Sequence, residues 1–217
     1  FLYAAMLDAG DILPNTLVSD IPTQIGSYNP QNYNEEFDGA VTAKRALARS
    51  LNVPSVRLLQ QFGLDRFYHY LRQLQLRDVK YNANHYGLSL ILGGGEVTLW
   101  NLCGAYASIG RTLIDFNNSS GKYRTKQNKF PLVTPIEMSK KTYSREPISL
   151  SAGSIYKTFE SMLKVIRPGS DGEWEQFNSS KPIAWKTGTS YGHRDAWAIG
   201  ISPNYTVGIW VGNADGE

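Results

Sequence analysis

The feature that most constrains the fold is a change in hydrophobic periodicity near residue 181 of the 217. Before this point apolar residues recur at helical spacing, for example over 65–75. After it, apolar and polar residues alternate as they do in strands, in three short runs at 183–189, 195–201 and 205–212. Helices followed by an antiparallel meander predict an α+β layered fold, with a mainly helical part over about 11–175 and closing strands over about 181–217.

Five further helices are expected before that change, each from its periodicity and its end signals. They are 1–9 ending at Gly10, 42–49 capped by Thr42, 55–62 resuming after a break at Pro54, 99–109 capped by Thr98 and stopped by Gly110, and 151–166 begun by Ser151. The stretch 11–38 shows neither period and is therefore predicted to be irregular. The stretch 111–147 is polar and basic, and 117–121 within it indicates a hairpin-like turn.

Composition excludes several classes of function. The chain carries 22 Lys and Arg against 19 Asp and Glu, a net charge of +3 without any basic stripe, so a nucleic-acid partner is not expected. The one cysteine, Cys103, excludes an internal disulfide and a cysteine-based zinc cage. The three histidines, His69, His85 and His193, lack metal-ligand spacing, so no metal or cofactor is expected.

The most informative motif is Lys186-Thr187-Gly188-Thr189-Ser190 on the first closing strand. An ammonium group, two hydroxyl groups and a glycine that admits a ligand close to the backbone suit the binding of a carboxylate. The alternative interpretation is an ordinary exposed strand end rich in threonine, which a lone Lys-Thr-Gly does not exclude.

A second motif, Ser50-Leu51-Asn52, lies at the junction of two predicted helices. Serine and asparagine at such junctions are commonly helix caps. Their order favours another interpretation, because Ser-x-Asn on a helix junction precedes Lys-Thr-Gly on a strand in the motif set of penicillin-binding proteins.

On these motifs the chain resembles the transpeptidase domain of bifunctional class A penicillin-binding proteins, a serine β-lactamase-like fold in which an antiparallel sheet is flanked by helices beside a helical subdomain. The resemblance spans nearly the whole chain. It rests on the segments 37–42, 46–56, 92–98, 105–107, 186–200 and 205–212, of which 186–200 and 205–212 are most similar to the 1C branch of the family.

The resemblance implies D,D-transpeptidation, in which a serine attacks the D-Ala-D-Ala bond of a peptidoglycan stem peptide and β-lactams trap the acyl-enzyme. Ser50 would relay protons, Asn52 would hold the substrate amide, and Lys186 would set the local field. Thr187 and Thr189, with Gly188 and Ser190 beside them, would bind the terminal carboxylate. The backbone N–H of Thr189 would form half of the oxyanion hole.

The resemblance also requires a nucleophile motif, Ser-x-x-Lys, ahead of Ser50. Three such matches occur, at Ser119, Ser154 and Ser161, but all follow Ser50 and chance accounts for about one of them. We therefore expect the chain to be truncated at both ends, with the nucleophile upstream of Phe1 and the fragment unreactive and poorly stable alone. A binding-only module of the same fold remains the alternative.

If the parent protein resembles the class A enzymes, it would carry a membrane anchor and a glycosyltransferase domain. It would act on the periplasmic side of the bacterial cytoplasmic membrane, with cell-wall synthesis proteins as possible partners. No apolar run in this sequence approaches the ~20 residues of a membrane span.

Overall fold

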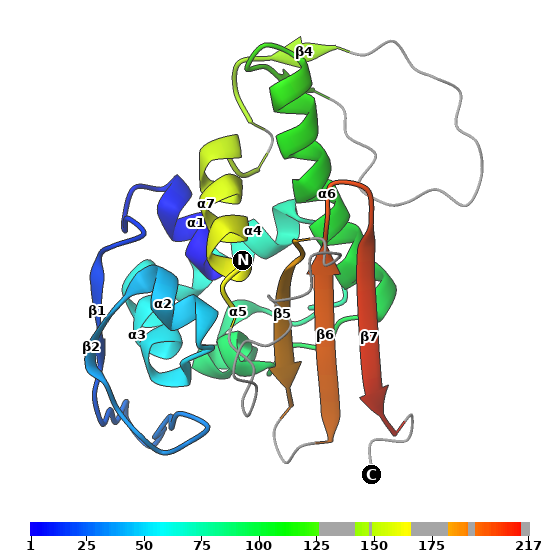
Figure 1. Ribbon diagram of the computed structural model, residues 1–217. Helices are drawn as coiled ribbons and strands as arrows, with labels where there is room; N and C mark the ends of the chain where they lie inside the picture. Colours follow the sequence, from blue (N-terminus) through cyan, green and yellow to red (C-terminus); the bar gives the residue numbers. More distant parts are fainter. Residues whose placement is uncertain (126–141, 148, 166–181, 191–193, 214–217) are drawn as a thin grey trace.

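A three-stranded antiparallel sheet and a group of helices beside it make up most of the computed structural model, which describes residues 1–125, 142–147, 149–165, 182–190 and 194–213 (Figure 1). The strands are β5 (Ala184–Thr189), β6 (Asp195–Ile201) and β7 (Thr206–Gly212), hydrogen-bonded in that order. The α+β class and the closing meander predicted from the sequence are therefore confirmed, with strand ends within one residue of those expected.

Two helices cover one face of this sheet. Helix α6 (Leu99–Asn118) lies against β7 and β6, and α7 (Ala152–Met162) lies against β5 (Figure 1). Ile199 and Ile201 on the covered face are buried with Tyr106 and Met162 of the helices. The other face of β7 exposes Val207, Ile209 and Val211, of which more than half of each surface is accessible. The low stability expected of the isolated chain stays a prediction.

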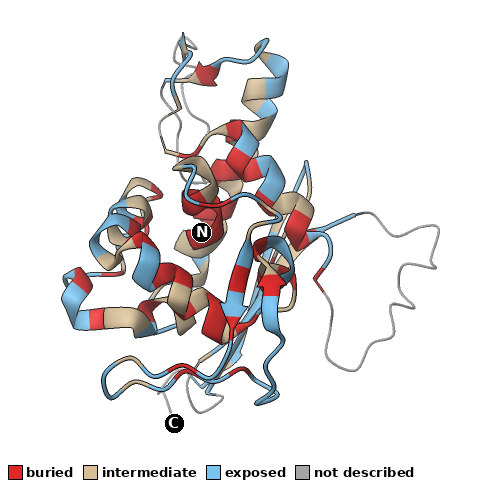
Figure 2. Ribbon diagram, turned by 90° about the vertical axis from the view of Figure 1, so that its left-hand side faces the viewer, coloured by how far each residue is buried: buried red, intermediate tan, exposed pale blue. Residues whose placement is uncertain are grey.

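The remaining helices lie on the β5 side of the sheet (Figure 1). They are α1 (Leu2–Asp8), α2 (Ala43–Ala48), α3 (Asn52–Phe62), α4 (Leu64–Gln73), α5 (Ala83–Tyr86) and the 3-10 helix η1 (Gly87–Leu92). Their apolar faces form the larger hydrophobic core, with Met6, Val53, Val56 and Leu59 fully inaccessible. Figure 2 shows this buried region around the N-terminus, where α1 packs against α7.

The stretch 11–38 is not irregular throughout, so that prediction was wrong. Strand β1 (Leu17–Asp20) pairs antiparallel with β2 (Gly39–Thr42), with Asp20 opposite Gly39. The alternation of β1 was hidden because its second inward-facing residue is a carboxylate rather than an apolar side chain: Val18 and Asp20 are both buried. A second short pair, β3 (Tyr123–Arg124) and β4 (Tyr143–Ser144), follows α6.

Gly110 does not end a helix, contrary to the prediction. Helix α6 continues to Asn118, and so the turn expected at 117–121 begins only after it. A Cβ atom at Gly110 would lie 2.7 Å from Cδ1 of Ile201. The glycine thus lets α6 approach the sheet closely.

Pro54 does not break the chain either. Helix α3 begins at Asn52 and includes Pro54 in its first turn, where the missing N–H costs nothing because it would have no partner within the helix. The break lies instead at Ser50.

Helix α7 starts after Ser151 as predicted but ends at Met162, and the predicted end at Ile166 lies outside the described residues. No helix in the described part of the chain is long and apolar enough to cross a membrane.

Candidate active site

Ser50 occupies the turn between α2 and α3 in a left-handed conformation, with φ of 55°. Its N–H donates to the carbonyl of Leu47 at 3.1 Å, and the N–H of Leu51 donates to the carbonyl of Ala46 at 3.0 Å. This pair of bonds is the Schellman ending of α2, in which glycine is the favoured residue at the position of Ser50. A serine here carries backbone strain of about 1–3 kcal/mol, and such strain is concentrated at functional sites.

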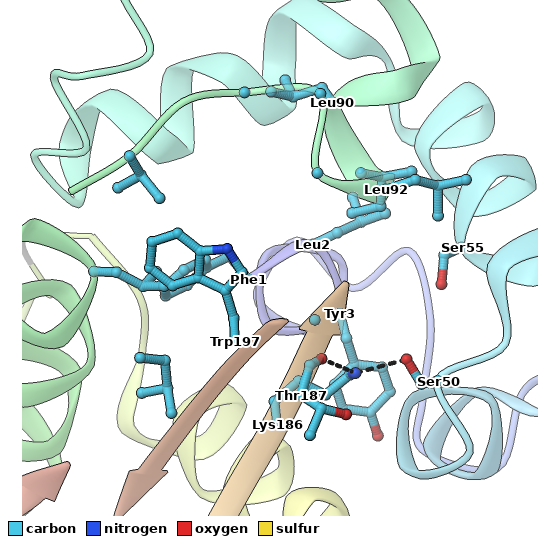
Figure 3. A pocket seen from close by; sticks show the side chains of 18 of the residues that line it. Phe1, Leu2, Tyr3, Ser50, Ser55, Leu90, Leu92, Lys186, Thr187 and Trp197 are labelled. Atoms are coloured by element: carbon cyan, nitrogen blue, oxygen red, sulfur yellow. Dashed lines mark hydrogen bonds between the residues drawn. The ribbon is translucent and has the colours of Figure 1, made fainter. Parts of the chain in front are cut away.

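Lys186 on β5 reaches this turn. Its Nζ donates to Oγ of Ser50 at 2.6 Å and to the carbonyl of Thr187 at 2.6 Å (Figure 3). Burial of the ammonium group disfavours its charged form and lowers the pKa of Lys186 from 10.5 to about 8. A cation held at a pocket wall by neutral oxygens is suited to an anionic ligand.

A pocket of about 640 Å³ opens between the helical part and β5. All the site residues predicted from the sequence line it, namely Ser50, Asn52, Lys186, Thr187, Gly188, Thr189 and Ser190. Thr187, Gly188 and Thr189 are exposed, and within the described sheet β5 is an edge strand. The structure therefore brings the two motifs to one pocket, with a strand edge accessible to a ligand.

Asn52, the first residue of α3, is held at the rim of this pocket. Its Nδ2 donates to the carbonyl of Gln31 at 2.9 Å. The N–H of the next residue, Val53, donates to Oδ1 of Asn32 at 3.1 Å. The amide group of Asn52 is thus fixed in place by the neighbouring 31–38 segment.

The wall opposite β5 was not predicted as part of the site. It consists of η1 and the three glycines that follow it, with Leu90 and Leu92 facing the pocket (Figure 3). A Cβ atom at Gly94 would lie 2.9 Å from the carbonyl carbon of Ser89, so the loop folds back onto η1 more closely than any side chain allows. The run of three glycines was the sequence signal, although it predicted only a turn.

A hydrogen-bonded group at the end of β5 was also missed. The N–H of Ser190 donates to the carbonyl of Asp195 at 3.0 Å, and the N–H of Asp195 donates to Oγ of Ser190 at 2.9 Å. The indole N–H of Trp210 on β7 donates to Oδ1 of Asp195 at 2.9 Å. These bonds join all three strands where the Lys-Thr-Gly segment ends.

Comparison with known families gives a match over residues 1–214 to the family described as penicillin binding protein transpeptidase domain. The chain belongs to this family. Together with the relatives below, the match confirms the resemblance to the transpeptidase domain of class A penicillin-binding proteins inferred from the sequence.

Relatives of the transpeptidase domain are longer proteins. Penicillin-binding protein 1C of Escherichia coli (strain K12) is 36% identical over 216 residues, which are 100% of this chain and 25% of that protein. Penicillin-binding protein 1A of Neisseria flavescens is 26% identical over 227 residues, covering 98% of this chain and 27% of that protein. The chain thus spans about a quarter of the length of these relatives.

Solved structures share the fold of this transpeptidase domain. Penicillin-binding protein 1A from Haemophilus influenzae superposes with a TM-score of 0.72 at 19% identity, over 99% of this chain and 37% of that one. The PonA1 protein from Mycobacterium tuberculosis in complex with penicillin V gives a TM-score of 0.72 at 16% identity, over 100% of this chain and 59% of that one.

The three Ser-x-x-Lys serines of the transpeptidase domain are engaged elsewhere. Oγ of Ser154 donates to Oδ1 of Asp8 at 3.2 Å, and Ser161 is 3.3 Å from the hydroxyl of Tyr3, both in the buried α1–α7 interface. Ser119 donates to the carbonyl of Asp115 at the end of α6. None of the three is among the described residues that line the pocket. The described residues also include no group of three His, Cys, Asp or Glu able to hold a metal ion.

Proposed function

We propose that this chain is the D,D-transpeptidase module of a larger peptidoglycan synthase. The observation that carries the proposal is the 2.6 Å hydrogen bond from Nζ of Lys186 to Oγ of Ser50. It couples an ammonium group to a hydroxyl that can accept one proton and donate another. This is the property required of a relay between a nucleophile and a leaving group.

Each motif residue has a role in this reaction. Lys186 biases the field at Ser50 and attracts the terminal carboxylate of the stem peptide, which the hydroxyl groups of Thr187 and Thr189 bind directionally. Asn52 binds a substrate amide. Gly188 leaves the strand edge accessible because it has no side chain, and Ser190 fixes the end of the strand through its hydrogen bonds to Asp195. The backbone N–H of Thr189 stabilises the oxyanion, a contact worth roughly 3 kcal/mol.

The nucleophile in this proposal is a serine that precedes Phe1 in the synthase. Its oxygen attacks the carbonyl carbon of the penultimate D-alanine, and the peptide bond breaks. The terminal D-alanine leaves with the proton of the attacking serine hydroxyl, which Ser50 relays. An amine from a neighbouring strand then attacks the acyl-serine ester, and as the ester bond breaks the proton that the amine gives up returns to the serine. The position of Phe1 and Leu2 supports this assignment, because both line the pocket and the amino group of Phe1 is close enough to Lys186 for their charges to interact (Figure 3).

The substrates follow from this chemistry. Stem peptides ending in D-Ala-D-Ala and β-lactams that mimic them are the proposed ligands. The proposed setting is the periplasmic side of the cytoplasmic membrane, in a synthase with a membrane anchor, a glycosyltransferase domain and cell-wall synthesis partners. The names of the relatives, penicillin-binding proteins 1C and 1A, support a synthase of this kind.

Covalent labelling of the full-length synthase with a fluorescent penicillin tests the proposal. We expect one label per molecule, with a rate constant lowered about 10²–10⁴-fold by Ser50→Ala or Lys186→Ala. Ser119→Ala is the matched control and should react as the wild type does. Reversible binding without a covalent adduct would indicate the binding-only module.

The 217 residues alone should remain unlabelled, because the loss of one member of a nucleophile–base unit is enough to abolish covalent turnover. Intact mass after incubation with penicillin measures this. A stoichiometric adduct on Ser119, Ser154 or Ser161 would contradict the assignment of the nucleophile.

A further inference from the structure

The 31–38 segment contacts the turn that carries Ser50 on both sides. Before the turn, the guanidinium group of Arg49 pairs with the carboxylate of Asp38. After it, Nδ2 of Asn52 donates to the carbonyl of Gln31, and the N–H of Val53 donates to Oδ1 of Asn32. The strained turn is therefore held at each end by one short stretch of chain.

A buried pair of polar side chains anchors this segment. Asp20 at the end of β1 is 0% exposed and Asn32 is 2% exposed. Nδ2 of Asn32 donates to Oδ1 of Asp20 at 2.7 Å and to the carbonyl of Glu36 at 2.8 Å. The N–H of Asp38 donates to the second oxygen of Asp20 at 3.0 Å. Asp20 thus fixes both ends of the segment that supports Ser50.

We infer that Asp20 and Asn32 are positioning residues, which hold the Ser50–Asn52 turn in the conformation that meets Lys186. The inference deepens the proposed function and rests on it. Neither side chain lies among the residues lining the pocket, so both act through the turn. Their support is needed because φ of 55° at Ser50 is unfavourable for a serine and persists only where neighbouring contacts enforce it.

A purely structural role accounts poorly for this pair. A fully buried carboxylate loses its hydration, and a well-packed apolar pair of the same volume commonly gives equal or greater stability. An apolar pair, however, makes no directional hydrogen bonds that could fix the position of the backbone. Asn32 binds Asp20 and Glu36 through its NH₂ group while its oxygen receives the N–H of Val53, so one amide fixes the start of α3 relative to β1.

Isosteric variants of the full-length synthase test the inference. Asp20→Asn places an NH₂ group against the donors of Asn32 or Asp38, and Asn32→Asp places two carboxylates in contact. The double variant D20N/N32D exchanges the amide and the carboxylate. It can restore the bonds from Asp38 and Val53 and between the two side chains. It loses the bond to Glu36, whose carbonyl then faces a carboxylate oxygen, so the return toward the wild type should be partial.

The first readout is hydrogen exchange of the Val53 amide, which does not depend on turnover. We expect exchange at least tenfold faster in each single variant and a return toward the wild type in the double variant. Leu74→Ala is the control, because Leu74 is buried in the core of the helical part and does not line the pocket. It should lower the melting temperature without accelerating exchange at Val53 relative to neighbouring amides of α3.

The second readout is acylation by penicillin, separated into a dissociation constant and an acylation rate constant. We expect the single variants to lower the rate constant about 10–100-fold with a smaller change in the dissociation constant, because misplacement of about 1 Å costs up to 10²-fold. Leu74→Ala should stay within twofold of the wild type. Unchanged Val53 exchange, or an unchanged rate constant beside a lowered melting temperature, overturns the inference. A wild-type synthase that is not acylated overturns the proposed function instead, and Val53 exchange then decides whether Asp20 and Asn32 hold the turn.

Discussion

The side chains of Lys186 and Ser50 meet at 2.6 Å although they are 136 positions apart in the chain. The contact joins an edge strand of the sheet to a helix junction in the helical part. Each partner is held in an unfavourable state: Lys186 is a desolvated cation, and Ser50 has a left-handed backbone. Because stability alone favours neither state, the pair supports the catalytic role proposed for these two residues.

The charge of Lys186 should limit penicillin capture at high pH. Burial lowers the pKa of Lys186 to about 8, so the ammonium group that attracts a carboxylate is lost as pH rises through that value. We expect the second-order rate of labelling of the full-length synthase to fall above about pH 8. In Lys186→Arg, whose guanidinium group stays protonated, this fall should be absent. A fall at the same pH in both proteins would assign the titration to another group.

The same lowered pKa predicts the pH dependence of stability. Between about pH 8 and 10.5, Lys186 keeps its proton in the unfolded chain and has lost it in the folded one. Since stability rises with pH wherever the unfolded state binds more protons, the contribution of Lys186 should grow across this window. The difference in melting temperature between the wild type and Lys186→Met, measured from pH 7 to 10, should shift in favour of the wild type.

Replacement of Ser50 should separate stability from activity. Ser50→Gly relieves the left-handed strain, and Ser50→Ala keeps it, while both remove the hydroxyl that Lys186 contacts. We expect the glycine variant to be more stable than the alanine variant by roughly 1 kcal/mol, after allowance for the greater entropy of unfolded glycine. Both should lose about 10²–10⁴-fold in acylation rate. Denaturant unfolding and labelling kinetics measure the two effects, and equal stability of the two variants would contradict the strain argument.

The bond between Trp210 and Asp195 should stabilise the end of β5. Trp210→Phe removes the indole N–H and leaves the carboxylate of Asp195 without this donor. A hydrogen bond to a charged group contributes about 1.5–3 kcal/mol, so we expect a loss of that order, together with slower labelling as the Lys-Thr-Gly edge loosens. Trp100→Phe, at an exposed position on α6, should change stability by less than about 0.5 kcal/mol. Similar losses in both variants would show that the bond contributes little.

Those features that depend on neighbouring residues in the sequence were predictable. The three closing strands follow from alternation and from a turn, and the helix starts at Thr98 and Ser151 follow from capping residues whose side chains do accept the expected backbone bonds. The Ser-x-Asn and Lys-Thr-Gly motifs could be found because each is a short string with a fixed order. Local signals therefore identified most of the helices, the closing strands and the motif residues that line the pocket.

Features that depend on distant partners were not predictable. The strand β1 was missed because Asp20 breaks its apolar pattern, and only the donor groups of Asn32 and Asp38 explain a buried carboxylate there. Gly110 was taken as a helix end because its neighbour Ile201 lies 91 positions further along the chain. The structural role of a glycine or a buried charge depends on the residues that face it, and these residues can be distant in the sequence.

Two glycine-to-alanine substitutions should therefore have opposite effects. A Cβ atom at Gly208 of β7 would lie 2.8 Å from Cδ1 of Leu99 and 3.0 Å from Cδ1 of Ile199, and closer still to Sγ of Cys103. We expect Gly208→Ala to destabilise the full-length synthase by about 1–3 kcal/mol through overpacking. A methyl group at Gly153 of α7 would meet no described atom within 4 Å, and the backbone there is helical, so Gly153→Ala should stabilise by up to about 1 kcal/mol.

Replacement of Cys103 tests whether crowding against its sulfur causes the destabilisation expected for Gly208→Ala. In the Gly208→Ala background, Cys103→Ala should recover part of the lost stability, whereas in the wild type it should cost stability because it leaves a small void between α6 and the sheet. Denaturant unfolding of the four proteins gives the coupling energy between the two sites. Additive effects would mean that β7 can move away from α6 without cost, and the close approach of helix and strand would then not be what requires a glycine at position 208.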